Sequence, residues 1–486
     1  MAAPAHTATT ATAIASTRRP GQATPLLLLL AATLLAGIGN GIAMVALPWL
    51  VLERTGSATA ASIVAAASSV PLLFASILSG TVVDRIGRKR TAMLSDLLSG
   101  LSVIAIPLVD HSLGLTVWAL AIFAALGSVF DPAGITARET MLPEAARTSG
   151  WRIDRVNSLY EAIFNAAYLI GPGVGGLLIA MVGASNTLWF TGAGFVLSIV
   201  AIAGIRLAGA SRALTPTDDG SFWANTKEGL AFVRDDRLLR AIAILNMAII
   251  ALYLPIEGVI LPAHFTAQGT PRYLGWVLMA MSAGGLVGAL AYGQWADRLG
   301  RRAIFVWCTV AMSLVIVGMA LLPPIVPLLI LSTVLGLTYG PLGPISNVAM
   351  QARTPDRLRG RVIGVMSSLA YAAGPLGYLL AGPLIDRLGL RTAFILLAVL
   401  ITIVAVAGLL VRSLHELDAL VLPEEAGPED EDDRIVSTLP NEVAGGLYPS
   451  MPLNHPTPHP ERHDATSARR PPASTVTKES PPDDRP

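Results

Sequence analysis

The chain has 486 residues and a mass of 50.7 kDa, and 53% of its residues are hydrophobic while only 14% are charged. Soluble domains carry roughly 25% charged residues, so this composition excludes a set of ordinary soluble domains and indicates an integral membrane protein. The net charge of +1 hides two opposite parts, because residues 413–486 hold 6 Lys and Arg against 15 Asp and Glu. The basic excess of the remaining chain lies between apolar runs, which argues against nucleic-acid binding.

Residues 1–24 are rich in Ala and Thr, and we expect a disordered cytoplasmic N-terminus there. The next apolar run exceeds the roughly 7 to 15 residues of a signal-peptide core, so it predicts a retained first span. Lipid cannot satisfy backbone polar groups, and strand-like alternation is absent, so the twelve runs predict an all-α membrane protein. The predicted spans are Pro25–Leu52, Ala58–Val82, Thr91–Val109, Leu115–Ala137, Val156–Met181, Thr187–Ile205, Ala241–Pro262, Leu274–Ala296, Ala303–Leu322, Ile325–Met350, Val362–Ile385 and Thr392–Val411.

Similar segments recur at an offset of about 206 to 213 residues, the clearest being GTVVDRIGRKR at Gly80–Arg90 and GQWADRLGRRA at Gly293–Ala303. Such a repeat predicts two six-helix halves in the same orientation. We assign the halves to residues 25–206 and 241–412, a central cytoplasmic loop to 207–240, and an acidic, Pro-rich, disordered tail to 413–486.

The connections between spans predict the orientation of the chain. When they are assigned alternately to two sides, 23 Lys and Arg fall on the side of the N-terminus and 4 fall opposite, namely Arg54, Arg272, Arg387 and Arg391. Positively charged loops stay in the cytoplasm. We therefore expect a multi-pass protein of the cytoplasmic membrane with both termini cytoplasmic.

The two GxxxDRxGR loops are the most specific motif of the chain. Asp84 ends its helix, where the helix dipole disfavours an acid, so it should serve another partner. Simple anchoring by positive charge explains the arginines but not the acid. A third copy, GPLIDRLGLR at Gly382–Arg391, falls on the outer side, and we interpret it as a tight turn only.

These loops resemble the signature of the major facilitator superfamily, and the resemblance extends over about residues 25–412. It implies two six-helix halves and a cytoplasmic latch that closes the inner gate. Asp131 lies seven residues before Arg138, and we interpret it as a structural partner of this latch. The gate residues implied in this way are Asp84, Arg85, Arg88, Asp131, Asp297, Arg298 and Arg301.

The fifth span contains LIGPGVGGLL, in which Gly171, Pro172, Gly175 and Gly176 combine a helix breaker with small residues. These residues allow close helix approach and bending, and ordinary packing is the alternative interpretation. The run resembles the GPxxGG antiporter motif, which is associated with export, although Ala167 replaces its usual upstream Gly.

A finer resemblance is carried by PWLVLERTGS, TARETMLPEAARTSGWRIDRVNSLYEAIFN, ALYLPIEGVILP and LRGRVIGVMSSLAYAAGPLG. These segments are similar to Tap-type pumps, a group known for efflux of tetracycline and aminoglycosides. Two features depart from related drug/proton antiporters: the predicted fourth span lacks a membrane-embedded Arg, and Asn40 stands where many relatives carry an acid.

Four acids fall within the predicted spans, at a cost of about 2.5 to 3.5 kcal/mol for a charge at a helix centre. Asp96 lies near Arg88–Arg90, which favours a structural role for this acid. We also favour a structural role for Asp131. Glu257 lies between Pro255 and Pro262 without a basic residue within a helical turn, so it is the main candidate for proton exchange unless it reaches the outer surface or bonds to backbone. Glu161 is the second candidate, with pairing to Arg152 or Arg155 as the rival interpretation.

The remaining expectations concern ligands. Polar residues of the spans are candidates for substrate contact, although each one also fits a packing hydrogen bond. Neither a GxxxxGK[ST] loop nor HExxH is present, and the sole cysteine, Cys308, lies in an apolar run, so we expect no cofactor, no metal and no enzyme activity. The cavity candidates are Asn40, Tyr160, Asn165, Tyr168, Asn246, Tyr253, Tyr339, Asn347 and Tyr371.

The sequence therefore predicts a monomeric, proton-coupled multidrug exporter that works by alternating access and takes drug-like small molecules. Export of an endogenous compound such as a siderophore or lipid-like metabolite is the alternative within transport. A transporter-like sensor or scaffold, whose tail binds a partner, is the alternative from another class.

Overall fold

The computed structural model describes residues 23–112, 114, 116–207 and 222–420, and these residues form helices without a strand among them. Twelve helical stretches are long and apolar enough to cross a membrane. The predicted all-α, twelve-span fold is confirmed. The first six spans comprise α1 (Thr24–Thr55), α2 (Ala58–Ile86), α3 (Arg88–Ser112), α4 (Val117–Glu139) with the short α5 (Leu142–Ser149), α6 (Ile153–Val182) and α7 (Ala184–Gly204).

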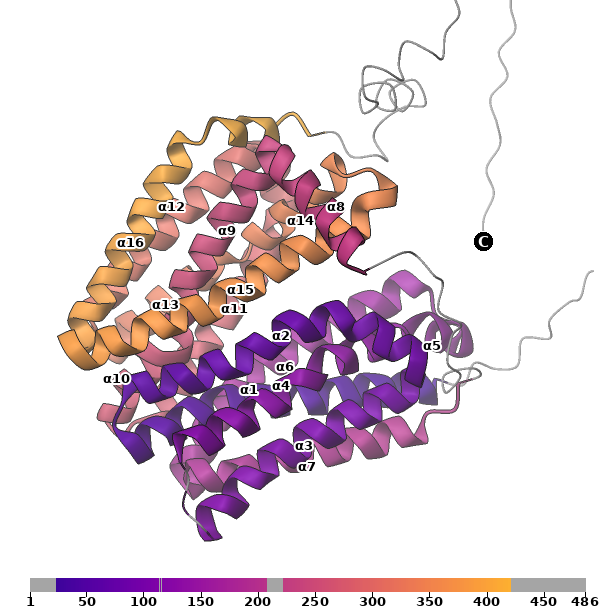
Figure 1. The fold of residues 1–486 in the computed structure, drawn as a ribbon, viewed down its shortest axis with the longest axis vertical. Coiled ribbons are helices and arrows are strands. Elements are labelled where there is room, and N and C mark those ends of the chain that lie inside the picture. The colour runs from indigo at the N-terminus through magenta and orange to yellow at the C-terminus, as the bar shows by residue number, and fades with distance from the viewer. Residues whose placement is uncertain (1–22, 113, 115, 208–221, 421–486) are drawn as a thin grey trace, which may run out of the picture. The chain divides into compact units, whose positions relative to one another are not determined.

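The second six spans repeat this arrangement after a connecting helix, α8 (Phe222–Asp235) (Figure 1). The Glu228 carboxylate of α8 pairs with Arg361 and, at 3.7 Å, with Arg357, which fastens α8 to the helix α15. The spans comprise α9 (Arg237–Pro255) with the π-helical η1 (Ile256–Ile260) and α10 (Leu261–Ala267), α11 (Pro271–Leu299), α12 (Arg301–Ala320), α13 (Ile325–Tyr339) with α14 (Leu342–Arg353), α15 (Asp356–Leu388) and α16 (Leu390–Leu410).

Successive spans alternate in direction, so their connections lie at two ends of the bundle (Figure 1). The two ends differ in charge. We call the end where α2 passes into α3 the basic end, and it carries both GxxxDRxGR loops. The end where α1 passes into α2 is called the opposite end. Large hydrophobic side chains such as Leu380, Leu410 and Trp307 are at least 70% exposed on the helices between these ends, as lipid contact requires.

A buried ion pair joins three helices of the first half. The Arg138 guanidinium of α4 pairs with Asp96 of α3, and both residues are buried. The Ser198 hydroxyl of α7 lies 2.6 Å from the second Asp96 oxygen and 3.1 Å from the Ala32 carbonyl oxygen of α1. This network corrects two expectations: Asp96 pairs with Arg138 rather than with Arg88–Arg90, and the fourth span does contain a buried Arg, because α4 continues two residues beyond the predicted Ala137.

The segment after α16 also differs from expectation. Residues from Ser413 onward were predicted to be disordered, but Arg412–Leu417 form a 3₁₀ helix, η2, with Leu414 and Leu417 fully buried. Asp418 accepts a 2.9 Å hydrogen bond from the Arg302 amide, and the Leu420 carbonyl accepts one of 2.8 Å from Arg301. Polar contacts and apolar burial therefore hold this segment against the basic end of α12. The rest of the predicted tail lies outside the described residues.

Removing the buried carboxylate should strongly destabilise the first half. Asp96→Asn removes the carboxylate that pairs directly with the buried Arg138, and breaking a buried pair in this way costs about 3 to 5 kcal/mol. Asp154→Asn is the matched control, because the Arg152–Asp154 pair is 3.0 Å long but highly exposed and should contribute less than about 1 kcal/mol. Thermal unfolding of the purified variants in detergent measures both effects. Equal melting temperatures for the two variants would contradict the role of the buried pair.

Candidate functional site

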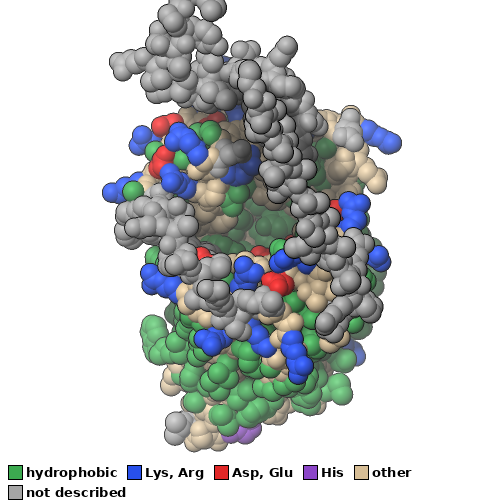
Figure 2. All heavy atoms as spheres, turned by 90° about the vertical axis from the view of Figure 1, so that its right-hand side faces the viewer, with side chains coloured by type: hydrophobic (Ala, Val, Ile, Leu, Met, Phe, Trp, Pro, Cys, Tyr) green, Lys and Arg blue, Asp and Glu red, His purple; other side chains and the backbone are tan. Residues whose placement is uncertain are grey.

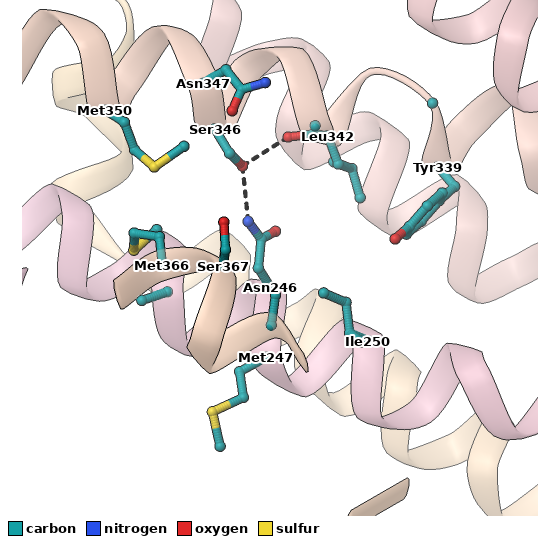
Figure 3. Close-up of a pocket in the computed structure, with 14 residues that line it drawn as sticks. Asn246, Met247, Ile250, Tyr339, Leu342, Ser346, Asn347, Met350, Met366 and Ser367 are labelled. Atoms are coloured by element: carbon teal, nitrogen blue, oxygen red, sulfur yellow. Dashed lines mark hydrogen bonds between the residues drawn. The ribbon is translucent and has the colours of Figure 1, made fainter. Parts of the chain in front are cut away.

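A pocket of about 250 Å³ lies in the second half, between α9, α14 and α15 (Figure 3). Asn246 donates a 2.8 Å hydrogen bond to the Ser346 hydroxyl, which donates in turn to the Leu342 carbonyl. Asn347, Ser367 and Tyr339 supply further polar groups, and no charged residue lines the pocket. Such walls bind molecules through shape, dispersion and a few hydrogen bonds. The apolar lining includes Met247, Ile250, Met350 and Met366.

Aromatic rings connect this pocket to Glu257. Tyr339 lines the pocket and stacks on Tyr253, with ring centroids 4.5 Å apart and an interplanar angle of 5°. The hydroxyl groups of Tyr253, Tyr339 and Tyr378 each interact electrostatically with the Glu257 carboxylate. Of the predicted cavity residues, Asn246, Tyr339 and Asn347 line the pocket and Tyr253 lies directly behind it.

Glu257 occupies an unusual backbone position. It belongs to the π-helical segment η1, between Pro255 and Pro262, where the helix widens by one residue per turn. Local π-helices of this kind occur frequently at functional sites. The side chain is half-buried, and within residues 23–420 as described it forms neither an ion pair nor a hydrogen bond. The Tyr378 ring packs beside it, against Gly258.

The first half places Asn40 against Asp131. The Asn40 amide donates to both carboxylate oxygens of Asp131, at 3.2 and 3.0 Å. The predicted contact of Asp131 with Asp84 and Arg85 is not found among the described side chains, because Asp131 points to α1. Asn40 also lines a small cavity between α1, α4 and α6 with Tyr160 and Tyr168.

Glu161 is exposed on α6, and the two arginines considered as its ionic partners make other contacts. Arg152 pairs with Asp154, and the Arg155 guanidinium lies 4.4 Å from the Trp151 ring centre. Asn165 donates a 2.8 Å hydrogen bond to the Glu161 carbonyl, one helical turn away. Glu161 therefore remains without an ionic partner in the described part of the chain, and it feels the charge of Glu139.

Both GxxxDRxGR loops turn at their second glycine. Gly87 has φ 92° and Gly300 has φ 77°, a region that essentially only glycine adopts with these ψ values. Asp84 is half-buried. Within the described residues, Asp84 makes no ion pair or hydrogen bond, and neither do the side chains of Arg85, Arg88 and Arg298. Arg301 bonds to Leu420 instead of to a gate partner. The side chain of Asp297 lies outside the described part.

The glycines of the fifth-span motif bring α6 close to two helices. A methyl group built on Gly171 would lie 2.7 Å from the Gly41 Cα of α1, and one on Gly175 would lie 3.1 Å from the Ile42 Cα. A methyl group on Gly176 would lie 2.6 Å from the Pro271 carbonyl oxygen of α11, in the other half. Pro172 lies inside the continuous helix α6. The motif thus packs within its own half and also against the second half.

The third DRxG copy is more than the tight turn that we predicted. Asp386 of α15 accepts hydrogen bonds from the Ser57 hydroxyl and from the Ala58 and Thr59 amides at the start of α2. These contacts join the two halves at the opposite end (Figure 1). The acid that recurs before this turn is the sequence feature that could have indicated the contact. Its partner Ser57, however, lies 329 residues away from Asp386 in the sequence.

The two halves separate toward the basic end. Figure 2, which faces this end, shows a hollow between them, with Lys and Arg around its rim and hydrophobic side chains on its visible wall. As far as the described residues show, the halves are therefore in contact at the opposite end, at Asp386 and Gly176, and a hollow lies between them at the basic end.

The comparisons with known proteins agree with this architecture. The chain is 48% identical over 402 residues to the "Multidrug efflux pump Tap" of Mycolicibacterium fortuitum, covering 82% of this chain and 98% of the relative. It is 22% identical to the "Macrolide efflux protein A" of Streptococcus pyogenes, over 78% of this chain and 94% of the relative. The crystal structure of the nucleoside transporter NupG matches 80% of this chain and 98% of its own, with a TM-score of 0.68 and 13% identity.

A family model described as "Transmembrane secretion effector" matches residues 15–436. This match spans all twelve candidate membrane helices. Together with the relative that is 48% identical over most of both chains, it shows that the chain belongs to the transmembrane secretion effector family of the major facilitator superfamily.

Proposed function

We propose that this protein is a proton-coupled exporter of drug-like small molecules that works by alternating access between its two halves. The relatives named as multidrug efflux pumps support the substrate class. The uncharged pocket with three methionines suits this role, because flexible side chains adapt to ligands of different shape. The basic end faces the cytoplasm in this proposal, so the structure corresponds to an inward-facing state.

The observation that carries the proton coupling is the position of Glu257. Among the described residues its carboxylate has no cationic partner, and it interacts electrostatically with Tyr253 and with Tyr339, which also lines the pocket. A carboxyl in apolar surroundings can be held as a neutral acid, and it becomes an anion when water or a cation reaches it. Substrate entry at Tyr339 and proton release at Glu257 are thereby coupled through one aromatic contact. Glu161 of α6, in the first half, is the second candidate.

Replacing Glu257 by Gln should abolish concentrative transport. Gln keeps the size and hydrogen-bonding capacity of the side chain but cannot carry a proton, so pH-driven uptake into inverted vesicles should fall to the level of empty vesicles. Downhill exchange should persist. Tetracycline, suggested by the resemblance to Tap-type pumps, is the probe, and Glu161→Gln is the matched control with a smaller expected loss. Wild-type proton release on tetracycline binding by purified Glu257→Gln would refute the assignment.

The gate residue Asp84 should act in the other state of the cycle. It has no partner among the residues that the structure describes, so Asp84→Asn should leave thermal stability in this state unchanged while transport falls. Arg301→Ala is the contrasting variant, because it removes the bond to Leu420 and should lower the melting temperature. Tetracycline transport and thermal unfolding, measured on the same preparations, distinguish the two effects. Wild-type transport by Asp84→Asn would remove its role in the gate.

The orientation of the chain can be tested by cysteine labelling. In a Cys308→Ser background, Ser112→Cys at the opposite end should react with an impermeant maleimide added to intact cells. Arg147→Cys, on α5 at the basic end, should react only after the membrane is permeabilised. Both side chains are exposed, so accessibility within the protein does not limit either reaction. The reverse pattern would place the termini outside.

A further inference from the structure

The N-terminus of α2 is capped partly by the other half of the molecule. Ser57 is the N-cap, and its hydroxyl accepts from the Ala60 amide at 3.2 Å. The remaining first-turn amides, of Ala58 and Thr59, donate to the two Asp386 oxygens at 2.9 Å each. The Ser57 hydroxyl also donates to Asp386 at 2.8 Å. A helix start leaves four amides without intrahelical partners, and here Asp386 supplies the acceptors for two of them.

The backbone around this contact is closely packed. Gly382 lies one helical turn before Asp386, and a methyl group built there would lie 2.7 Å from the Ala58 carbonyl oxygen and would collide with Ser62. Asp386 makes no ion pair within the described residues, so its charge is balanced by the positive end of α2 and by hydrogen bonds.

The equivalent contact on the other side of the molecule lacks an acid. At the repeat offset of 206 residues, Gly382 corresponds to Gly176, which packs against the start of α11 in the same manner. Asp386 corresponds to Ala180, which offers no carboxylate. The contacts between the halves at the opposite end thus include two similar backbone contacts, and one of them carries a carboxylate.

We propose that Asp386 is the latch that holds the opposite end closed, and that it releases α2 when this end opens. The proposal rests on the alternating-access function proposed above. The three hydrogen bonds and the interaction with the helix dipole exist only while α2 and α15 are in contact, so they stabilise one state and not the other. Because Asp386 is exposed, loss of its charge should shift the ratio of the two states by roughly two- to fivefold toward opening at this end.

A distance measurement tests the latch without requiring transport. Spin labels at Ser112→Cys and Thr392→Cys, in a Cys308→Ser background, report the separation of the two halves at the opposite end, because both sites are exposed and lie one in each half. Asp386→Asn should increase the long-distance population, and Ser57→Ala should do so to a smaller extent. Asp110→Asn is the matched control, since this carboxylate at the same end pairs with Arg54 of its own half at 2.7 Å. Unchanged distances in Asp386→Asn, or an equal change in Asp110→Asn, would overturn the proposal.

A cross-link between α2 and α15 provides a second test, which measures transport instead of a distance. Ser57→Cys combined with Asp386→Cys should form a disulfide under oxidation, which should stop tetracycline transport until a reductant is added. Oxidised, fully cross-linked protein that still transports would refute the latch. The distance shift and the transport assays are independent, so a failure of drug export in the wild-type protein would refute the proposed function and leave the latch testable.

Discussion

The cost of leaving a charge unpaired in an apolar environment is the constraint that organises the first half. Asp96 and Arg138 are both buried, and the Ser198 hydroxyl occupies the remaining Asp96 oxygen. Their mutual neutralisation avoids two separate desolvation penalties and ties α3, α4 and α7 together. The same hydroxyl contacts α1 through the Ala32 carbonyl. Four helices are therefore linked by one polar network, so a conformational change is easier between the halves than within this half.

The same constraint sorts the four acids predicted in the spans. Asp96 is committed to Arg138, and Asp131 accepts both of its hydrogen bonds from Asn40. Of these four acids, only Glu161 and Glu257 have no side-chain partner among the described residues. Asn40 is thus a donor that satisfies a carboxylate, which gives a physical reason for a neutral amide at this place. A carboxylate without a fixed partner is free to exchange a proton or to meet a cation, and this distinguishes Glu257 and Glu161 from the structural acids.

Much of the fold was predictable from the sequence because hydropathy is a local property. The apolar runs gave the twelve spans, and the duplicated DRxG loops pointed to the turns at Gly87 and Gly300. Errors arose where a partner is distant in the sequence or an end is misplaced by a few residues. Arg138 was placed outside the fourth span by one position, so its buried pair with Asp96 was missed. The bond between Asp386 and Ser57 requires knowledge of how the halves pack, which no local pattern contains.

The candidate site shows the same division between local and distant information. Residue type alone indicated Asn246, Tyr339 and Asn347, and these line one pocket. The methionines of that pocket and the Tyr378 ring beside Glu257 were missed, since apolar and aromatic residues of a membrane helix are usually packing residues. Whether these methionines and Tyr378 line the pocket or pack against neighbouring helices depends on which helix faces they occupy after the halves fold.

The asymmetry of the two contacts between the halves has a mechanical consequence. The α6–α11 contact combines close backbone packing at Gly176 with a neutral hydrogen bond of 3.5 Å, which the Ser282 hydroxyl donates to the Tyr168 carbonyl. The α2–α15 contact adds three hydrogen bonds to the Asp386 carboxylate, and hydrogen bonds to a charged group are stronger than a neutral one. As the opposite end begins to open, the first contact is lost early and the second persists longer. Opening should then begin on the α6–α11 side, with α2 and α15 as the last pair of helices to separate.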